Sequence, residues 1–391
     1  MRMVRAARLL PFIAPGIVAL NVAAAHAGTR LDAVLDCGAD PSGRRDSASA
    51  LNACIAGRSQ TALYFPPGEY RLGGTLSVDG NNVTLYSDAR ATATLRAEAC
   101  GDTLRFSRGS MQIFNDSVRN LLIEGSGSCP QTAVHVIDGS WFEIDNAQVV
   151  GFNDAQERSV GVRTEGREGF RLTNSNIQAN RPVSMGVNPN HPYLSADHVH
   201  IADLYSIVAG AKARGYHITL DPGVVVTNMT IDGQNPFARG CGILQWTSKV
   251  APVSVSYMLK VSNLRFEQQS ADCGAQLDIE QPSGWPLQEL LIENVAFNPS
   301  PNALRLVNVD SATIAYSKNP SPVAGHFIEA TNLLFLELRN NSVMAKNDRV
   351  VIDGHDIETG YGRWVIGPAR GKNCCDPDDV RSLDSGTWSR Y

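Results

Sequence analysis

Most of the chain alternates apolar and polar residues over short runs, which is the pattern of half-buried β-strands. Representative runs are Thr103–Ser107, Ala133–Ile137 and Ala303–Val307, and Gly, Asn and Asp punctuate the text between such runs. Clear helical periodicity is confined to Asp46–Ala56, with Gly57 as a stop signal. The pattern therefore predicts an all-β protein with one short helix near its beginning.

The strand-like runs resemble one another along the chain, and an Asn recurs at what reads as a corner between two strands. The corner positions are Asn146, Asn174, Asn228, Asn263 and Asn294, and Ala196-Asp197-His198 fills the double interval before Asn228. Periods of about 20–50 residues are typical of solenoids. Asn tolerates left-handed backbone geometry and could bond to its neighbours along the axis. We predict a single-stranded right-handed parallel β-helix of about eight to ten coils with a short N-terminal capping helix. An antiparallel sandwich is the alternative, although no regular Asn-Gly or Asp-Gly hairpins support it.

The chain divides into four predicted segments. Residues 1–27 combine a basic start, an apolar run and Ala25-His26-Ala27, which is typical of a signal peptide cleaved after Ala27. A retained membrane anchor is the alternative. Residues 28–80 are expected to form an N-terminal cap (the helix and a Pro-Pro-Gly hairpin), 81–350 the β-helix and 351–391 a C-terminal cap or tail. We expect a secreted or periplasmic protein with no membrane contact in its mature form.

Charge and cysteine content narrow the class further. The chain has 34 basic and 39 acidic residues and a net charge of −5, so it lacks the basic footprint of nucleic-acid binding. Its eight cysteines suit an oxidising compartment. Cys100 and Cys129 stand before similar strand-like runs, as do Cys241 and Cys273, so each pair would be adjacent on successive coils and could form a disulfide. Free buried thiols are the alternative.

Three stretches near the start carry a family resemblance: Val34–Gly43, Asp46–Asn52 and Leu63–Tyr70, which ends in Phe-Pro-Pro-Gly-Glu-Tyr. They resemble the opening of the pectate-lyase-like ("lyase 3", rhamnogalacturonase-type) superfamily of right-handed parallel β-helix proteins, although Cys37 stands where that family carries an aromatic residue. The resemblance implies the β-helix and a polysaccharide partner. It also makes Ca²⁺ a possible cofactor, with no other cofactor expected. These stretches mark the fold, and they do not specify a reaction.

A parallel β-helix presents strand side chains alternately inward and outward, so the outward set can be read from the pattern. With Leu104, Val134, Val162 and their equivalents inward, the outward side chains form a ladder along the coil axis. The candidate catalytic residues on it are Lys212, Arg163, His135, Asp278 and Glu280, and the candidate substrate-binding residues are Arg105 and Arg305. For Lys212, the alignment uses the run Ile207–Lys212 as a ladder strand.

Two reactions fit this set. Eliminative cleavage of a uronate needs a cation on the carboxylate, such as Arg163 or Arg305, and a base for the C5 proton, such as Lys212 or His135. Hydrolysis needs two flanking carboxylates, which Asp278 could provide together with Glu280. Because cations outnumber carboxylates on the ladder, we favour a lyase. A β-helix glycoside hydrolase and a non-catalytic carbohydrate-binding or structural solenoid are the alternatives.

A second polar cluster follows residue 190 and adds Arg214 and His217 as candidate substrate-binding residues. His198 and His200 would share a strand face, but no third ligand has a diagnostic spacing, so no metal site is assigned. Trp246 is a candidate for stacking on a sugar ring, and Trp141, Trp285 and Tyr193 could do the same or serve as packing residues.

Overall fold

The computed structural model describes residues 28–341 apart from short gaps, and four strands beyond them. The gaps are 167, 189, 193–194, 211–214, 234–235, 267–273, 298–301, 319–324 and 340, and the later strands are 350–353, 363–366, 380–382 and 387–390. The predicted signal peptide, Cys273, Tyr193, Lys212 and Arg214 lie outside the described residues.

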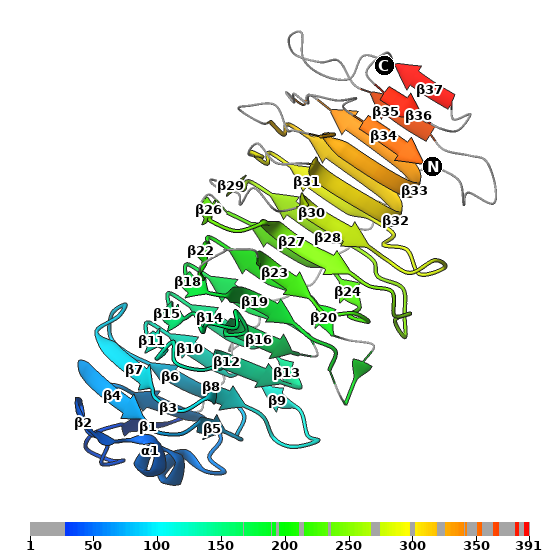
Figure 1. The fold of residues 1–391 in the computed structure, drawn as a ribbon. Helices are drawn as coiled ribbons and strands as arrows, with labels where there is room; N and C mark the ends of the chain where they lie inside the picture. Colours follow the sequence, from blue (N-terminus) through cyan, green and yellow to red (C-terminus); the bar gives the residue numbers. More distant parts are fainter. Residues whose placement is uncertain are drawn as a thin grey trace, which may run out of the picture.

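The strands stack into an elongated parallel solenoid of about ten turns (Figure 1). Three sheets run along its axis, and every pairing between consecutive turns of these sheets is parallel. This arrangement confirms the predicted β-helix and excludes the antiparallel sandwich. One sheet, which we name the ladder sheet, carries the predicted outward row; we name the other two the second and third sheets, in the order in which each turn visits them.

The strands fall into the sheets as follows. The ladder sheet contains β5 (Leu76–Val78), β8 (Gly101–Phe106), β12 (Gln131–Ile137), β16 (Val160–Glu165), β19 (Arg181–Met185), β23 (Tyr216–Leu220), β27 (Gly242–Thr247), β30 (Ala275–Glu280), β34 (Val350–Asp353) and β36 (Val380–Ser382). The second sheet contains β1 (Thr29–Asp32), β3 (Thr61–Tyr64), β6 (Val83–Tyr86), β10 (Ser117–Arg119), β14 (Glu143–Asp145), β17 (Arg171–Thr173), β21 (His200–Ala202), β25 (Met229–Asp232), β28 (Leu259–Ser262), β31 (Leu290–Glu293), β35 (Arg363–Ile366) and β37 (Thr387–Arg390). The third sheet contains β2 (Ser42–Asp46), β4 (Gly68–Leu72), β7 (Ala93–Ala97), β11 (Leu122–Glu124), β15 (Gln148–Phe152), β18 (Asn176–Ala179), β22 (Tyr205–Val208), β26 (Pro236–Ala238) and β29 (Arg265–Phe266).

Two long strands, β32 (Asn302–Ala315) and β33 (Ile328–Arg339), pass through both the ladder sheet and the second sheet. Four short strands lie between these two sheets in earlier turns: β9 (Ile113–Phe114), β13 (Gly139–Ser140), β20 (Ala196–Asp197) and β24 (Val226–Thr227).

The interior of the solenoid is apolar because most inward residues of the strands are Leu, Ile, Val or Phe. Leu104, Val134, Leu277 and Leu304 are fully buried, as the alternation predicts. At about 25 cal/mol per Å² of apolar area removed from water, this stacked interior is the main stabilising contribution. A single turn could not form it, because its inward face is covered only by the neighbouring turns.

Left-handed residues form two rows of corners. We name the turn from the ladder sheet into the second sheet the first corner, and the turn from the second sheet into the third sheet the second corner. The second-corner residues with positive φ include Asn120, Asn146, Asn174, Asp203, Gly233, Asn263 and Asn294, and Tyr316 takes this place at the end of β32. Side-chain amides bond along this row, for example from Asn146 Nδ2 to Asn120 Oδ1 at 2.8 Å and from Asn294 Nδ2 to Asn263 Oδ1 at 2.9 Å.

The structure corrects the predicted corner assignment in the middle of the chain. Asn228 and His198 have left-handed φ values of 55° and 49°, but both lie at the first corner, after β24 and β20. In the second-corner row their places are taken by Asp203 and Gly233. The prediction mixed the two rows because Asn serves both corners in other turns.

Helix α1 (Ala48–Ile55) falls within the predicted helix and lies at the N-terminal end of the solenoid, where Leu51 and Ile55 are buried in the core (Figure 1). Disulfides join Cys37 to Cys54 and, as predicted, Cys100 to Cys129. Cys241 is disulfide-bonded as well, and its predicted partner, Cys273, lies outside the described residues. Within the described part of the chain, no helix has the length and hydrophobicity needed to span a bilayer.

Candidate functional site

The ladder sheet holds one outward residue of each turn in strict register. Its members, each paired with the next, are Arg105, His135, Arg163, Ser184, Thr219, Gln245, Asp278, Arg305 and Glu329. Parallel strands are about 4.8 Å apart, so this row presents a polar side chain at each step along the axis. Five predicted site residues, Arg105, His135, Arg163, Asp278 and Arg305, are in this row, and Glu280 lies two residues further along β30. We name this row of paired ladder-sheet residues the outward row.

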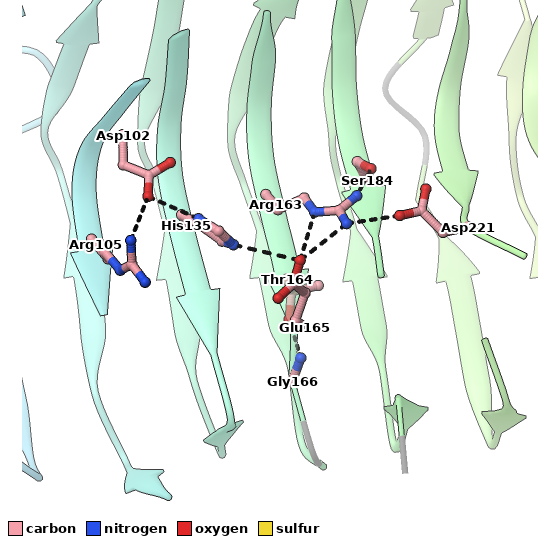
Figure 2. Close-up of polar contacts among 9 residues, drawn as sticks. All are labelled: Asp102, Arg105, His135, Arg163, Thr164, Glu165, Gly166, Ser184 and Asp221. Atoms are coloured by element: carbon pink, nitrogen blue, oxygen red, sulfur yellow. Dashed lines mark hydrogen bonds and ion pairs between the residues drawn. The ribbon is translucent and has the colours of Figure 1, made fainter. Parts of the chain in front are cut away.

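His135 is at the centre of the N-terminal part of the outward row (Figure 2). Its Nδ1 lies 2.9 Å from Asp102 Oδ2 on the preceding turn, and the same carboxylate lies 3.7 Å from Arg105. Its Nε2 lies 3.8 Å from Glu165 Oε1 on the following turn, which is an ion-pair distance and too long for a hydrogen bond. Nε2 is enclosed and has no hydrogen-bond partner among the described residues. Such an atom in a native fold calls for a functional or structural reason.

Arg163 connects the next three turns of the same group. Its Nε and one terminal nitrogen contact Glu165 Oε1 at 3.2 and 3.0 Å. Its terminal nitrogens also contact Asp221 Oδ2 at 2.7 Å and Ser184 Oγ at 2.8 Å (Figure 2). The edge of the guanidinium that could bind a carboxylate bidentately is therefore occupied. Arg163 is placed to position Glu165, and Arg105, about half exposed, is the more accessible cation.

The electrostatics of this group follow from burial and from its carboxylates. Burial opposes the charged form of His135, but the carboxylates of Asp102 and Glu165 outweigh it and raise the pKa of His135 above its usual value. His135, together with Arg163 and against the effect of burial, lowers the pKa of Glu165. The His135 imidazole thus lies between two carboxylates on a solvent-facing sheet, and both carboxylates favour its protonated form.

Near the C-terminal end of the outward row, Arg305 joins the two carboxylates that were predicted as a hydrolytic pair. Its terminal nitrogens lie 2.8 Å from Asp278 Oδ1 and 2.6 Å from Glu280 Oε2. Burial raises the pKa of Asp278 despite the opposing effect of Arg305. Because both carboxylates bind the same guanidinium, neither approaches a substrate without breaking an ion pair. We name Asp278, Glu280 and Arg305 the Arg305 clasp.

Two predicted substrate-binding residues are inside the solenoid, so these predictions are wrong. His217 is fully buried: its Nδ1 lies 2.8 Å from Ser206 Oγ, and its ring stacks on Phe237 at a centroid distance of 5.0 Å. Burial lowers its pKa to about 3, so it is neutral in this setting. Trp246 is also fully buried. Trp246 follows the inward alternation of β27, whereas His217 breaks it, because both His217 and Ile218 of β23 are buried.

The alignment that placed Lys212 on the ladder is wrong about the strand. Ile207 belongs to β22 in the third sheet, where it pairs with Gln178 and Ala238. The ladder strand of that turn is β23, which begins at Tyr216. Apolar alternation is the same in both sheets, so it could not identify which sheet a run joins. Lys212 and Arg214, in the connection between β22 and β23, lie outside the described residues.

Three carboxylates of the site were missed at the sequence level: Asp102, Glu165 and Asp221. Glu165 continues the alternation that identified Arg163, so the pattern contained a signal for it. Asp102 carried no such signal, because its contact with His135 crosses between turns.

A hollow of about 550 Å³ lies away from the outward row, among residues that include Asn153, Asp154, Gln178 and Arg239. The Asp154 carboxylate accepts hydrogen bonds from its own loop, including the backbone amides of Arg158 and Ser159, so it serves to fold that loop. Among the described residues, no group of three or more His, Cys, Asp or Glu side chains is arranged to hold a metal ion.

Comparisons with known proteins agree with this architecture. The family model described as "Rhamnogalacturonase A/epimerase, pectate lyase-like" matches residues 33–189. The A-module of the mannuronan C-5 epimerase AlgE6 of Azotobacter vinelandii is similar in structure, with 13% identity, a TM-score of 0.51 and coverage of 92% of this chain and 97% of that chain. The surface protein and adhesin PfbA of Streptococcus pneumoniae has 13% identity, a TM-score of 0.57 and coverage of 93% and 98%.

The Dettilon tailspike protein is similar too, with 11% identity, a TM-score of 0.51 and coverage of 93% of this chain and 68% of that chain. At these identities, the similarity to solved structures concerns the fold. No curated protein sequence matches the chain. The family model thus matches residues 33–189, and the parallel solenoid continues the same fold through the turns that follow.

Proposed function

We propose that the protein is exported and binds an acidic, uronate-containing polysaccharide along the outward row. It cleaves this polysaccharide by β-elimination at the His135 group, by which we mean Asp102, Arg105, His135, Arg163, Glu165 and Asp221. The observation that carries the proposal is the register of the row: successive turns place Arg105, His135 and Arg163 side by side on a solvent-facing sheet. An extended glycan could contact several turns at once. The disulfides and the predicted signal peptide support export.

Elimination requires neutralisation of the uronate carboxylate, removal of the C5 proton and protonation of the leaving oxygen. Arg105 is the accessible cation for the carboxylate. His135, with its raised pKa, is suited to protonate the leaving oxygen through Nε2, and the surrounding side chains must move to uncover that atom. Lys212 remains our candidate for the base.

One assay tests this proposal. The mature protein is incubated with polygalacturonate, with alginate and with exopolysaccharide of the producing cell, while the ultraviolet absorbance of unsaturated uronate and the concentration of reducing ends are followed together. A joint rise supports a lyase, and Lys212→Ala should then abolish turnover while Asp278→Asn leaves it largely intact. A rise in reducing ends alone indicates hydrolysis and overturns the elimination proposal.

A non-catalytic carbohydrate-binding role is the second candidate, and a specific observation favours it. Each charged side chain in the His135 group and in the Arg305 clasp is within ion-pair distance of another. Such mutual neutralisation is expected of a stable binding surface. Retained binding with neither product signal would establish this role instead.

A further inference from the structure

The first corner of the turn that carries His135 is occupied by an unusual residue. At the first corner, most other turns use Asn or Gly in the left-handed region: Asn82, Asn115, Gly169, Asn228, Asn308 and Asn332, whereas His198 takes this place two turns after Trp141. Here the residue is Trp141, with φ of 56° and a side chain that is about half exposed. A bulky residue in this region is strained, because its Cβ crowds the backbone. The indole stays exposed, so burial of the ring does not offset this strain.

The neighbouring turns hold the indole against the surface. A Cβ on Gly169, one turn further on, would lie 2.4 Å from Trp141 Cε3, so only glycine lets the ring lie against the backbone there. The imidazole of His198, on the turn after that, has its centroid 6.4 Å from the indole and is tilted by 41°. His198 Nδ1 lies 2.9 Å from Asp197 Oδ1. Two partly exposed rings therefore lie side by side along the corner.

A third aromatic residue lies on the preceding turn. Phe114, which is partly exposed, pairs with Ser140, the residue before Trp141. Trp141 and His198 thus present two neighbouring rings along the corner, with Phe114 one turn earlier. A pyranose ring matches that surface, because it has an apolar C–H face and a rim of hydroxyl groups, and aromatic rings with adjacent polar groups suit such amphipathic partners.

We propose that Trp141, flanked by Phe114 and His198, is a stacking platform that holds one pyranose ring of a glycan lying on the ladder sheet. We name these three residues the Trp141 platform. The identity of the glycan bound by the platform rests on the proposed function. The platform and His135 belong to the same turn, because β12 leads from His135 towards Trp141. Six residues separate the two positions, and Asp138 between them has a left-handed φ of 55°, so the separation is at most roughly 20 Å at ~3.3 Å per residue. Contact at both places is thus within reach of an oligosaccharide.

The test replaces Trp141 with the residue that other turns use. Trp141→Asn removes the ring and relieves the backbone strain, so we expect a Tm equal to or above that of the wild type. Binding is measured by affinity electrophoresis in gels that contain polygalacturonate or alginate. We expect Trp141→Asn to bind about tenfold more weakly, the scale of one aromatic contact, and Trp141→Phe to restore part of the affinity.

Tyr316 supplies a matched control, because it is a similarly exposed aromatic residue with φ of 52° at the end of the second-sheet strand segment of β32. Tyr316→Asn should leave retardation in the gel unchanged. Equal retardation of the wild type and Trp141→Asn, or no retardation of the wild type, overturns the platform. A fall in Tm for Trp141→Asn would show that the indole is a packing residue. A smaller apparent mass of Trp141→Asn than of the wild type in size-exclusion chromatography would show that these residues bind a second copy of the chain. Either the fall in Tm or the smaller mass would overturn the proposal.

The outcomes separate the platform from the proposed lyase activity. Weaker retardation of Trp141→Asn without any unsaturated product supports the platform and contradicts the lyase. If product forms, Trp141→Asn should raise KM about tenfold and leave kcat near the wild-type value, because the platform is distant from the bond that breaks. Product formation with an unchanged KM and unchanged retardation would support the lyase alone.

Discussion

The two charged ends of the outward row both pair arginine with carboxylates, but only one contains a histidine, and they differ in how completely their hydrogen-bonding groups are used. In the Arg305 clasp, one guanidinium binds Asp278 at 2.8 Å and Glu280 at 2.6 Å. Around His135, the contacts extend over several turns, and the nitrogen facing Glu165 stays 3.8 Å from it. A closed pair contributes mainly to stability, whereas a polar atom left unpaired inside a charged group is available for chemistry.

The comparison therefore assigns different consequences to similar substitutions. Changes around His135 should alter turnover more than stability, and changes in the Arg305 clasp should do the opposite. The following experiments test this separation, from the largest expected effect to the smallest.

The largest effect is expected for His135→Gln, which keeps a side chain able to bond to Asp102 but removes the ionisable ring. Loss of a general acid typically reduces turnover by about 10²–10⁴-fold. The rate of unsaturated-product formation gives this number, and circular dichroism checks that the fold is retained. Undiminished turnover in a folded His135→Gln protein would remove the functional half of the comparison.

Arg305→Met should lower the free energy of unfolding by about 1–2 kcal/mol, because it leaves two neighbouring carboxylates without their cation. The effect is smaller than for a fully buried pair, since these side chains are partly exposed to water. Urea denaturation measures it, and adding Asp278→Asn and Glu280→Gln to Arg305→Met should recover most of the loss. Turnover should stay close to that of the wild type; a loss as large as that of His135→Gln would break the comparison.

The two regions should contribute to stability over different pH ranges. The raised pKa of His135 gives stability that is present below pH 6.5 and lost as the pH rises through its folded value. The raised pKa of Asp278 likewise gives stability that is lost as the pH rises from 3.8 through its folded value. His135→Gln should flatten the upper window and Asp278→Asn the lower one, as measured by urea denaturation across the pH range. Parallel curves for the wild type and both variants would contradict this separation.

Asp116 must be replaced in that experiment, because burial raises its pKa to about 7 and the Val83 amide opposes this only in part. Its Oδ2 has no hydrogen-bond partner among the described residues. The protonated form is favoured in the folded state, so stability falls as the pH rises from 3.8 towards 7. Asp116→Asn should thus stabilise the protein most above pH 7, and an unchanged stability curve would contradict the raised pKa.

The smallest effect is expected for Arg105→Ala. Arg105 is about half exposed and 3.7 Å from Asp102, so its removal should change the free energy of unfolding by no more than about 0.5 kcal/mol. If Arg105 binds the uronate carboxylate, KM should nevertheless rise, and the rise should diminish at high salt. A stability loss as large as that of Arg305→Met would mean that the two regions are not distinct.

Much of the fold could be predicted from the sequence because its determinants are local. Alternation identified the inward residues of β8, β12, β30 and β32, and left-handed Asn residues identified most of the corners. The assignment failed where two sheets have the same local pattern: Ile207–Lys212 was placed on the ladder although Ile207 belongs to β22. His217 failed for a related reason, since two consecutive residues of β23 point into the core.

The sequence by itself determined the repeating turn, the apolar interior, one disulfide and most of the outward row, because each depends on alternation and spacing within a few residues. Only the tertiary structure decided which charges pair, since the contacts of His135 with Asp102 and of Arg305 with Asp278 cross between turns about 30 residues apart in the chain. The position of the Trp141 ring was likewise decided by the tertiary structure, because the ring lies against the backbone of Gly169 one turn away. The physical reason is that stacking converts a separation of one turn into a distance of about 4.8 Å, and a local pattern does not contain that distance.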